Sequence, residues 1–419
     1  MTETAFLTVE GRWTRKRAWA LSLVATFTMV ISYMDRQTLA VLAPVLTESL
    51  GIRDQAYGWL ASAFSFAYLV GAPLAGRWID RVGARRGLLL AVLAWTLVAA
   101  AHTIAPGFAA LFALRILLGF AEAPSFPGAS QAVHRALPPE DRPRGLGVLF
   151  TGSSLGAMIT PPLAVFLATR FGWRMAFLGT ALAGLCWVPL WLKVAWSPEG
   201  RRVLDRPAEE TKRPSLSLAA LLGHRAVQRG CLVVLSAAPA IGFILLWGSK
   251  LLVRQQGLSQ AEVGAYLWLP PLFFDLGSVG FGDLAARREK ARPGGRPDRF
   301  LFAWAMLLCT AIALEPLARS PWEAVLFLGV AMVGGGGLFS LLTHDALRRV
   351  PEGSVSATGG LFAASQSLAY VVANPLIGFG SQRLGSFTLV CVALGLWVLP
   401  GCLAWLYLRA PPAREEAPR

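Results

Sequence analysis

The chain has 419 residues, of which 55% are hydrophobic and only 15% are charged. A soluble protein of this length usually has about a quarter of its residues charged, so the composition excludes an ordinary soluble domain. The formal net charge of +15 could suggest a nucleic-acid partner, but the distribution of the basic residues along the chain indicates otherwise.

Twelve apolar runs, separated by charged residues, glycines and prolines, are each long enough to cross a bilayer as a helix. In chain order we expect spans at 18–46, 57–76, 87–106, 109–134, 146–169, 174–195, 230–250, 262–283, 300–318, 322–343, 354–380 and 385–408. No cleavable signal peptide is expected, because the first run is far longer than a signal h-region. The predicted fold is an all-α membrane protein with twelve transmembrane helices.

Lysine and arginine concentrate in alternate loops. With the N-terminus placed in the cytoplasm, 29 of them fall in segments on the inside and 7 on the outside. This asymmetry is the positive-inside bias, and it predicts that both termini are cytoplasmic. The basic charge therefore indicates topology and contact with anionic lipid, and no nucleic-acid partner is expected.

The longest polar interruption, Ser197–Gly230, divides the spans six and six. We expect a cytoplasmic N-terminal segment (1–17), a six-helix half (18–195), a cytoplasmic linker (196–229), a second six-helix half (230–408) and a cytoplasmic tail (409–419). Such a duplication is typical of transporters whose site lies between the halves. The sequence SLSLAALL in the linker predicts a short amphipathic helix on the membrane surface.

A loop after the second span of each half supports the duplication. The first is GRWIDRVGARRG, Gly76–Gly87, and the second is contained in GSVGFGDLAARREK, Gly277–Lys290. Both have glycines, an aspartate and a basic pair, and the aspartate of the second copy is Asp283. The second copy is degenerate, because Val279 stands where the first copy has Gly76.

The first of these loops has the residues of a conformational latch. Gly76 and Gly83 permit close helix approach and a tight turn. Asp80, at a helix end, can accept backbone N–H groups or pair with arginines, and could latch the two halves together. The basic residues near it are Arg81, Arg85 and Arg86. Alternatively, these arginines only set the topology.

Four ionisable residues lie at membrane depth in the first half. At ~1.5 Å per residue, Asp35 and Arg36 lie roughly 15–17 Å below the outer end of the first span. On the fourth span, Arg115 is roughly 9 Å deep and Glu122 roughly 20 Å deep. The hydrocarbon is ~30 Å thick, so both acids fall near its middle.

Two interpretations of these four residues stay open. They could form a structural ion-pair network between two spans, with no net charge. They could also form a proton-coupled anion site, because arginine grips a carboxylate with a planar fork and a poorly solvated acid can exchange protons. Charged residues in a span usually face a cavity, and a single rearranging network could do both.

Other polar residues within spans are weaker candidates. Tyr33, Gln37 and Tyr68 could line the cavity, or simply pack. Lys250 could contact the substrate or snorkel to the interface. Further candidates are Ser153, Gln366 and Asn374. Asn374 precedes Pro375, so it could either satisfy backbone groups freed by the proline or bind a sugar hydroxyl.

The fifth span contains GSSLGAMITPPL, Gly152–Leu163. Gly152 and Gly156 are four residues apart, a spacing that lets two helices touch, and the prolines bend the span. The five cysteines are expected to be small buried hydrophobes, and no metal site is expected. We find no pattern typical of a nucleophile and base or of a phosphate-binding loop, so an enzyme is not expected.

The chain resembles the major facilitator superfamily, most clearly in GRWIDRVGARRG. Within it, the sequence resembles the anion:cation symporters, particularly the bacterial hexuronate, glucarate and galactonate carriers. The motifs that carry this likeness are YMDRQTLAVLAP, RILLGFAEAPSFPG, GSSLGAMITPP, WGSKLLVRQQGLS and WLPPLFFDLGS. The tenth and eleventh spans depart from the pattern of this group.

The resemblance implies proton symport of a sugar acid by alternating access across a bacterial inner membrane. It makes Asp35 and Glu122 the proton-coupling acids, Arg36 the substrate-binding arginine and Arg115 the residue coupled to Glu122. Polar substrate contacts would come from the helices that carry Tyr68, Ser153, Gln366 and Asn374.

The expected partners are a small anionic substrate, protons and membrane lipid. We expect a monomer that needs no cofactor beyond the proton gradient. A carrier or antiporter for another carboxylate or an amphiphilic anion is the alternative, and a sensor without transport is a third.

Overall fold

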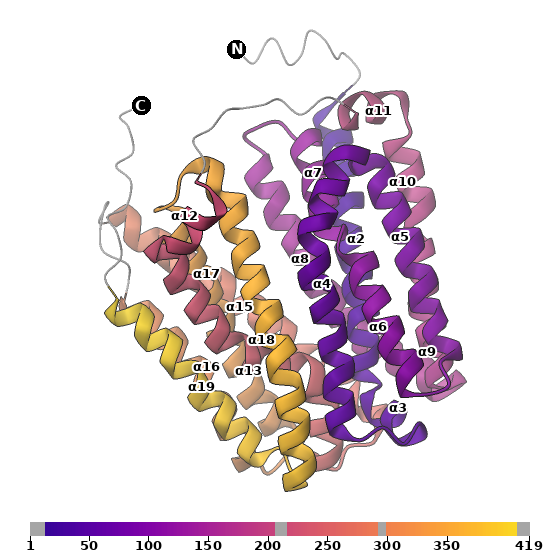
Figure 1. Ribbon diagram of the computed structural model, residues 1–419, viewed down its shortest axis with the longest axis vertical. Helices are drawn as coiled ribbons and strands as arrows, with labels where there is room; N and C mark the ends of the chain where they lie inside the picture. The colour runs from indigo at the N-terminus through magenta and orange to yellow at the C-terminus, as the bar shows by residue number, and fades with distance from the viewer. Residues whose placement is uncertain (1–12, 206–215, 292–298, 409–419) are drawn as a thin grey trace. The chain divides into compact units, whose positions relative to one another are not determined.

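The computed structural model describes residues 13–205, 216–291 and 299–408, and these residues form helices, short 3-10 turns and connecting loops (Figure 1). Most of the expected N-terminal segment and the whole of the expected tail, 409–419, lie outside the described residues. The all-α prediction is confirmed.

The described residues of the first half of the sequence form ten helices and one 3-10 turn. Their bounds are α2 (Arg15–Val41), α3 (Ala43–Ser49), α4 (Asp54–Val82), α5 (Ala84–Ala101), η1 (His102–Ile104), α6 (Phe108–Glu122), α7 (Ser125–Ala136), α8 (Arg142–Phe171), α9 (Trp173–Leu185), α10 (Trp187–Ala195) and α11 (Pro198–Leu204).

The second half begins with the short helix predicted in the linker, which is α12. The bounds are α12 (Leu218–Gly223), α13 (Arg225–Gln256), α14 (Gln260–Val263), α15 (Leu269–Ala291), α16 (Arg299–Cys309), η2 (Thr310–Leu317), α17 (Pro321–Leu347), η3 (Glu352–Ser354), α18 (Val355–Leu384) and α19 (Thr388–Tyr407).

Within the described residues, eleven helical segments are long and apolar enough to cross a membrane. The remaining predicted span corresponds to α15, which has 23 residues but carries two aspartates and a basic C-terminal end. The first predicted span, 18–46, is interrupted, because α2 ends at Val41 and α3 begins at Ala43. Pro44 explains the break, since proline is tolerated in the first turn of a helix but not within one.

The chain divides into two compact units. The first has residues 1–39 and 67–209, and the second has residues 40–66 and 210–419. The second unit therefore includes the segment 40–66, which holds α3 and the start of α4. The predicted halves, 18–195 and 230–408, place that segment in the first half.

The first unit has a tryptophan-rich core. Trp95, Trp187 and Trp191 are fully buried, and the last two stack with ring centroids 5.1 Å apart. Each of these stacked rings also donates its indole N–H to a backbone carbonyl, Trp187 to Val24 and Trp191 to Arg85. Burying a large ring while satisfying its one polar group stabilises the packing of α10 on its neighbours.

The glycine pair of the fifth span brings α8 directly against α2. A Cβ atom at Gly152 would lie 2.8 Å from the carbonyl oxygen of Thr26, and one at Gly156 would lie 2.3 Å from that of Val30. Neither distance is tolerable, so the predicted close approach is confirmed. This contact supports the stretch of α2 that carries Tyr33.

The second unit is built around α13, which packs on α17, α18 and α19 (Figure 1). One buried ion pair of this unit joins Arg229 of α13 to Asp345 of α17 at 3.3 Å, and Arg229 also donates to the carbonyl of Trp405. Trp405 stacks on Phe302 with ring centroids 3.8 Å apart. A buried cation is thus given a counter-charge and a carbonyl, which offsets its desolvation.

Candidate functional site

The structure brings the four ionisable residues of the first unit together. Nε of Arg36, on α2, donates to Oε2 of Glu122, on α6, at 2.7 Å. The hydroxyl of Ser32 donates to the same oxygen at 2.7 Å. Asp35 and Arg115 are both buried, and Asp35 lies within electrostatic reach of all three other residues. Residues far apart in sequence therefore form one cluster.

The guanidinium of Arg36 lies between two aromatic rings. Its carbon is 4.8 Å from the ring centroid of Tyr33 and 4.6 Å from that of Tyr68. Contacts of this kind orient a planar cation and stabilise it away from water. The Arg36 side chain is 16% exposed, whereas that of Glu122 is fully buried. Of this ion pair, Arg36 is therefore the member that a ligand could reach.

The two acids retain unused acceptor capacity. Among the described residues, neither oxygen of Asp35 accepts a hydrogen bond, and Oε1 of Glu122 accepts none. Unused oxygens on a buried carboxyl group are costly if the group is ionised, but one of them can carry a proton. The geometry therefore suits two acids that exchange protons.

A buried histidine belongs to the surroundings of this cluster. His102, in η1, is buried, stacks on Phe177 at 5.3 Å and lies within electrostatic reach of Arg115. Its Nδ1 is 2.9 Å from the carbonyl oxygen of Val98. His102 ends a different span from Arg115, so no spacing in the sequence could have linked them.

Ser153 is half-buried on α8, next to the glycine that packs on α2. The contact between α8 and α2 therefore fixes where Ser153 lies.

In the second unit, Gln366 and Asn374 of α18 are linked through Tyr370. Gln366 donates to the hydroxyl of Tyr370 at 3.1 Å, and Asn374 donates to its backbone carbonyl at 2.9 Å. Asn374 also accepts from the indole of the buried Trp247 at 2.9 Å. The single tyrosine between these two residues in the sequence was not singled out as a candidate.

The carbonyl that Pro375 leaves without its helical donor belongs to Val371. It accepts instead from the hydroxyl of Ser62, on α4, at 3.0 Å. The prediction that Asn374 could satisfy this carbonyl is therefore wrong, because its amide turns back to the carbonyl of Tyr370.

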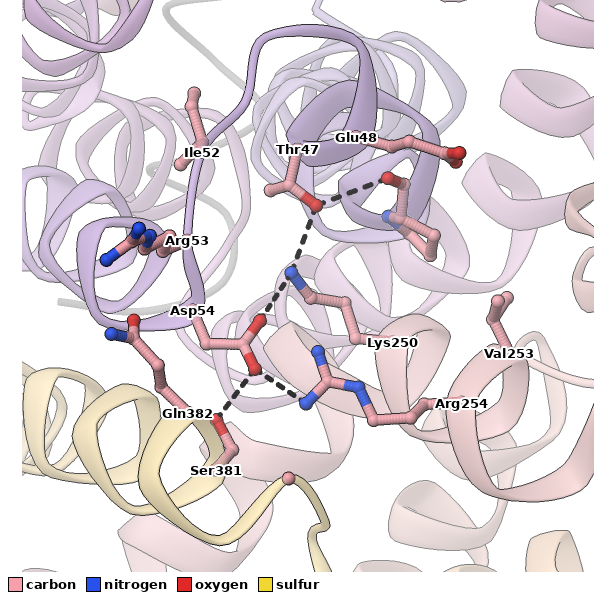
Figure 2. A pocket seen from close by; sticks show the side chains of 12 residues that line it. Thr47, Glu48, Ile52, Arg53, Asp54, Lys250, Val253, Arg254, Ser381 and Gln382 are labelled. Carbon is pink, nitrogen blue, oxygen red and sulfur yellow. Dashed lines mark hydrogen bonds and ion pairs between the residues drawn. The ribbon is translucent and has the colours of Figure 1, made fainter.

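Lys250 is buried in an ion pair (Figure 2). Its Nζ is 2.7 Å from Oδ1 of Asp54 and donates to the hydroxyl of Thr47 at 3.0 Å. Arg254, one turn further along α13, donates to the other oxygen of Asp54 at 2.6 Å. The amine of Lys250 is buried against Asp54 and does not reach outward, so the snorkelling alternative is wrong. The sequence did not predict Asp54 and Arg254 as site residues, because they are 200 residues apart in the chain and nothing in the sequence links them.

The predicted latch has different partners from those expected. Asp80 accepts from the amide of Gln131 at 3.1 Å, and Gln131 in turn accepts from the backbone N–H of Ala84 at 2.9 Å. Arg85 forms a two-bond ion pair with Asp205, at the end of α11, at 3.0 and 2.6 Å. Within the first unit, this pair ties the start of α5 to the segment after α10.

The remaining loop residues are less constrained. Gly83 has φ +82° and turns the chain before α5, as expected. Around Gly76 there is open space, so the prediction of a close helix approach there is wrong. Arg81 is exposed. Asp283 pairs only within its own helix in the contacts described, with Arg287 at 2.7 Å, and both are largely exposed.

Long apolar helices that bury ion pairs between them are typical of a multi-pass membrane transporter. The chain belongs to the Major Facilitator Superfamily, whose profile matches residues 25–373. This is a family of transporters and not of enzymes.

The chain is similar to several characterised carriers along most of its length. It is 26% identical to the hexuronate transporter of Escherichia coli strain K12, over 95% of this chain and 96% of that protein. It is also 26% identical to the hexuronate transporter of Bacillus subtilis, over 90% and 89%. The D-galactonate transporter of E. coli O6:H1 is 26% identical over 93% and 95%.

Solved structures show the same fold. A bacterial homologue of the human lysosomal transporter Spinster superposes with a TM-score of 0.74 at 16% identity, and 94% of each chain is covered. The nucleoside transporter NupG superposes with a TM-score of 0.73 at 11% identity, over 93% of this chain and all of that one.

Proposed function

We propose that this protein is a proton-coupled symporter of a small organic anion of the sugar-acid class, such as a hexuronate, glucarate or galactonate. The observation that carries the proposal is the Arg36 guanidinium, which lies between Tyr33 and Tyr68 and is bound to Glu122. The likeness to hexuronate and galactonate transporters supports the substrate class.

The ion pair supplies a simple coupling rule. While Glu122 is ionised, it holds the Nε edge of Arg36 and supplies the negative charge that a substrate would bring. When Glu122 takes up a proton, that charge disappears and Arg36 can bind a substrate carboxylate through its fork. Substrate and proton therefore load together, and loss of the proton favours release of the substrate.

Asp35 serves as a second proton carrier beside this pair. Its carboxyl group is buried, and its oxygens accept no hydrogen bond among the described residues. Arg115, within electrostatic reach of both acids, adjusts the balance between them. Two acids and two arginines leave the cluster neutral overall, so one proton and one monoanion enter without changing its net charge.

The wider setting follows from charge and family. We propose that the protein lies in a bacterial inner membrane with both termini in the cytoplasm, which the concentration of 29 basic residues in alternate segments supports. The proton gradient is the driving force, no cofactor takes part, and the monomer is the transporting unit. Hydroxyl recognition in the first unit would use Tyr68 and Ser153.

A carrier or antiporter for a different carboxylate is the second candidate. One observation favours it: the eleventh span commits Asn374 to Trp247 and Tyr370, which leaves less of its amide for a sugar hydroxyl. A more apolar anion would need fewer such donors.

Uptake of labelled sugar acids into proteoliposomes, with and without an inward proton gradient, tests the proposal. We expect accumulation of glucuronate or galactonate only when the gradient is present. If accumulation is the same without the gradient, proton symport is wrong. If other carboxylates are accumulated and sugar acids are not, the second candidate replaces the first.

A further inference from the structure

A pocket of about 470 Å³ in the second unit is lined by residues of four helices, several of them charged (Figure 2). It brings together the end of α3, the start of α4, the last turns of α13 and the end of α18. The residues of interest are the cations Arg53, Lys250 and Arg254, the acids Glu48 and Asp54, and the hydroxyl groups of Thr47 and Ser381.

The centre of this cavity already holds a carboxylate. Asp54 accepts from Lys250 and Arg254 through different oxygens, at 2.7 and 2.6 Å, and from the hydroxyl of Ser381 at 3.1 Å. Lys250 is further held by the hydroxyl of Thr47 and lies 5.2 Å from the ring centroid of Tyr57. These groups form a preorganised carboxylate-binding site, which is occupied by a side chain of the same protein.

The charges of this site are not balanced by Asp54 alone. Lys250 and Arg254 are four residues apart on one helix, so they repel each other unless an anion lies between them. One aspartate offsets only one of the two positive charges. Lys250 is 6% exposed and Arg254 34% exposed, so the surplus charge faces the cavity through Arg254.

We propose that this cavity is an outer binding site for the substrate carboxylate, at which an incoming hydroxylated carboxylate displaces Asp54 from Lys250 and Arg254. The inference rests on the proposed function for the identity of the anion. Thr47 and Ser381 supply hydroxyl groups that suit a polyhydroxylated acid. With the N-terminus in the cytoplasm, this end of α13 lies on the outside, where substrate arrives.

The proposal predicts that substitutions of Arg254 and Asp54 change the anion affinity in opposite directions. Arg254→Gln removes a ligand of the substrate and should weaken anion binding about fivefold, which is near the upper end of the range for exposed ion pairs because Arg254 is only partly exposed. Asp54→Asn removes the competitor and should strengthen it by a similar factor. A purely structural ion pair would give both variants the same loss.

The test is a glucuronate titration of the full-length protein in detergent, in which the shift in the thermal unfolding temperature reports binding. All proteins carry Arg36→Ala, which removes the site of the first unit. We expect weak binding in Arg36→Ala, tighter binding when Asp54→Asn is added, and loss of that gain when Arg254→Gln is also added. Glu48→Gln and Arg53→Gln remove the same charges from the same cavity, outside the ion pair, and should change binding less than twofold.

Several outcomes would overturn the proposal. Equal weakening by Asp54→Asn and Arg254→Gln would leave the ion pair as a structural tie. If Glu48→Gln and Arg53→Gln change binding as much as Asp54→Asn and Arg254→Gln do, the net charge of the pocket attracts the anion and no specific site exists. A response to chloride as large as that to glucuronate would exclude a carboxylate site. Failure of the proposed function is a separate result: the wild-type protein would then transport no sugar acid in proteoliposomes, whatever this titration shows.

Discussion

Replacing Arg36 with lysine tests the substrate-binding arrangement most directly. The variant keeps the positive charge at the same depth but removes the planar fork and the Nε–H that Glu122 accepts. It also removes the flat surface that fits between Tyr33 and Tyr68. Charge alone would leave substrate affinity nearly unchanged, whereas the geometry described above predicts a large loss.

The size of the loss can be worked out from the contacts. A charge-assisted hydrogen bond contributes about 1.5–3 kcal/mol, and one of the two arms of the fork is lost. The poorer fit between the two rings adds about 0.5–1 kcal/mol. The sum is roughly 2–4 kcal/mol, which corresponds to a decrease in substrate affinity of roughly 30- to 1,000-fold.

Equilibrium binding of labelled glucuronate to the purified proteins measures this effect. Arg81→Lys is the matched control, because Arg81 is exposed and lies outside the cluster. The control should bind like the wild-type protein. If Arg36→Lys binds within threefold of the wild type, the fork and the aromatic rings do not hold the substrate, and the reasoning fails.

Three further predictions follow from individual contacts. Glu122→Gln should abolish gradient-driven accumulation and retain counterflow exchange; equal loss of both would indicate a structural role. Gly156→Ala places a methyl group against a backbone carbonyl and should lower stability by about 1–3 kcal/mol in thermal unfolding, whereas Gly147→Ala, in open space, should not. Hydrogen bonds from Arg15 hold the pKa of Asp141 below its usual range, so they stabilise the fold above pH ~4, and this contribution is lost as the pH falls further. Thermal unfolding should therefore separate the wild type from Asp141→Asn clearly at pH 7 and by less at pH 3.

The sequence predicted the helices well, because hydrophobic length is a simple one-dimensional quantity. Hydrophobic length set the spans, and a fixed rise per residue placed Asp35 and Glu122 at the same level. The break at Leu42 was missed, since the apolar run continues through Pro44 and hydropathy does not register a kink.

Partners were harder to predict than positions. Depth fixes the height of a residue along a helix but not the direction of its side chain, so the direct bond of Arg36 to Glu122 and the place of His102 near Arg115 came from the structure. In the same way, Arg85 was expected near Asp80, but it pairs with Asp205, a residue 120 positions further along the chain.

In the second unit, too, the sequence predicted the position of a charged residue but not its partner. Lys250 was a candidate because it is a cation at the end of a span, yet its role depends on Asp54, which looked like an ordinary loop residue. Buried cations need a counter-charge, and where that counter-charge is a movable side chain, a ligand with the same chemistry can replace it. Arg36 with Glu122 and Lys250 with Asp54 are both cations held by an internal carboxylate. If both cations bind substrate as proposed, each stays paired with an internal carboxylate when no substrate is bound, and the substrate exchanges one carboxylate for another.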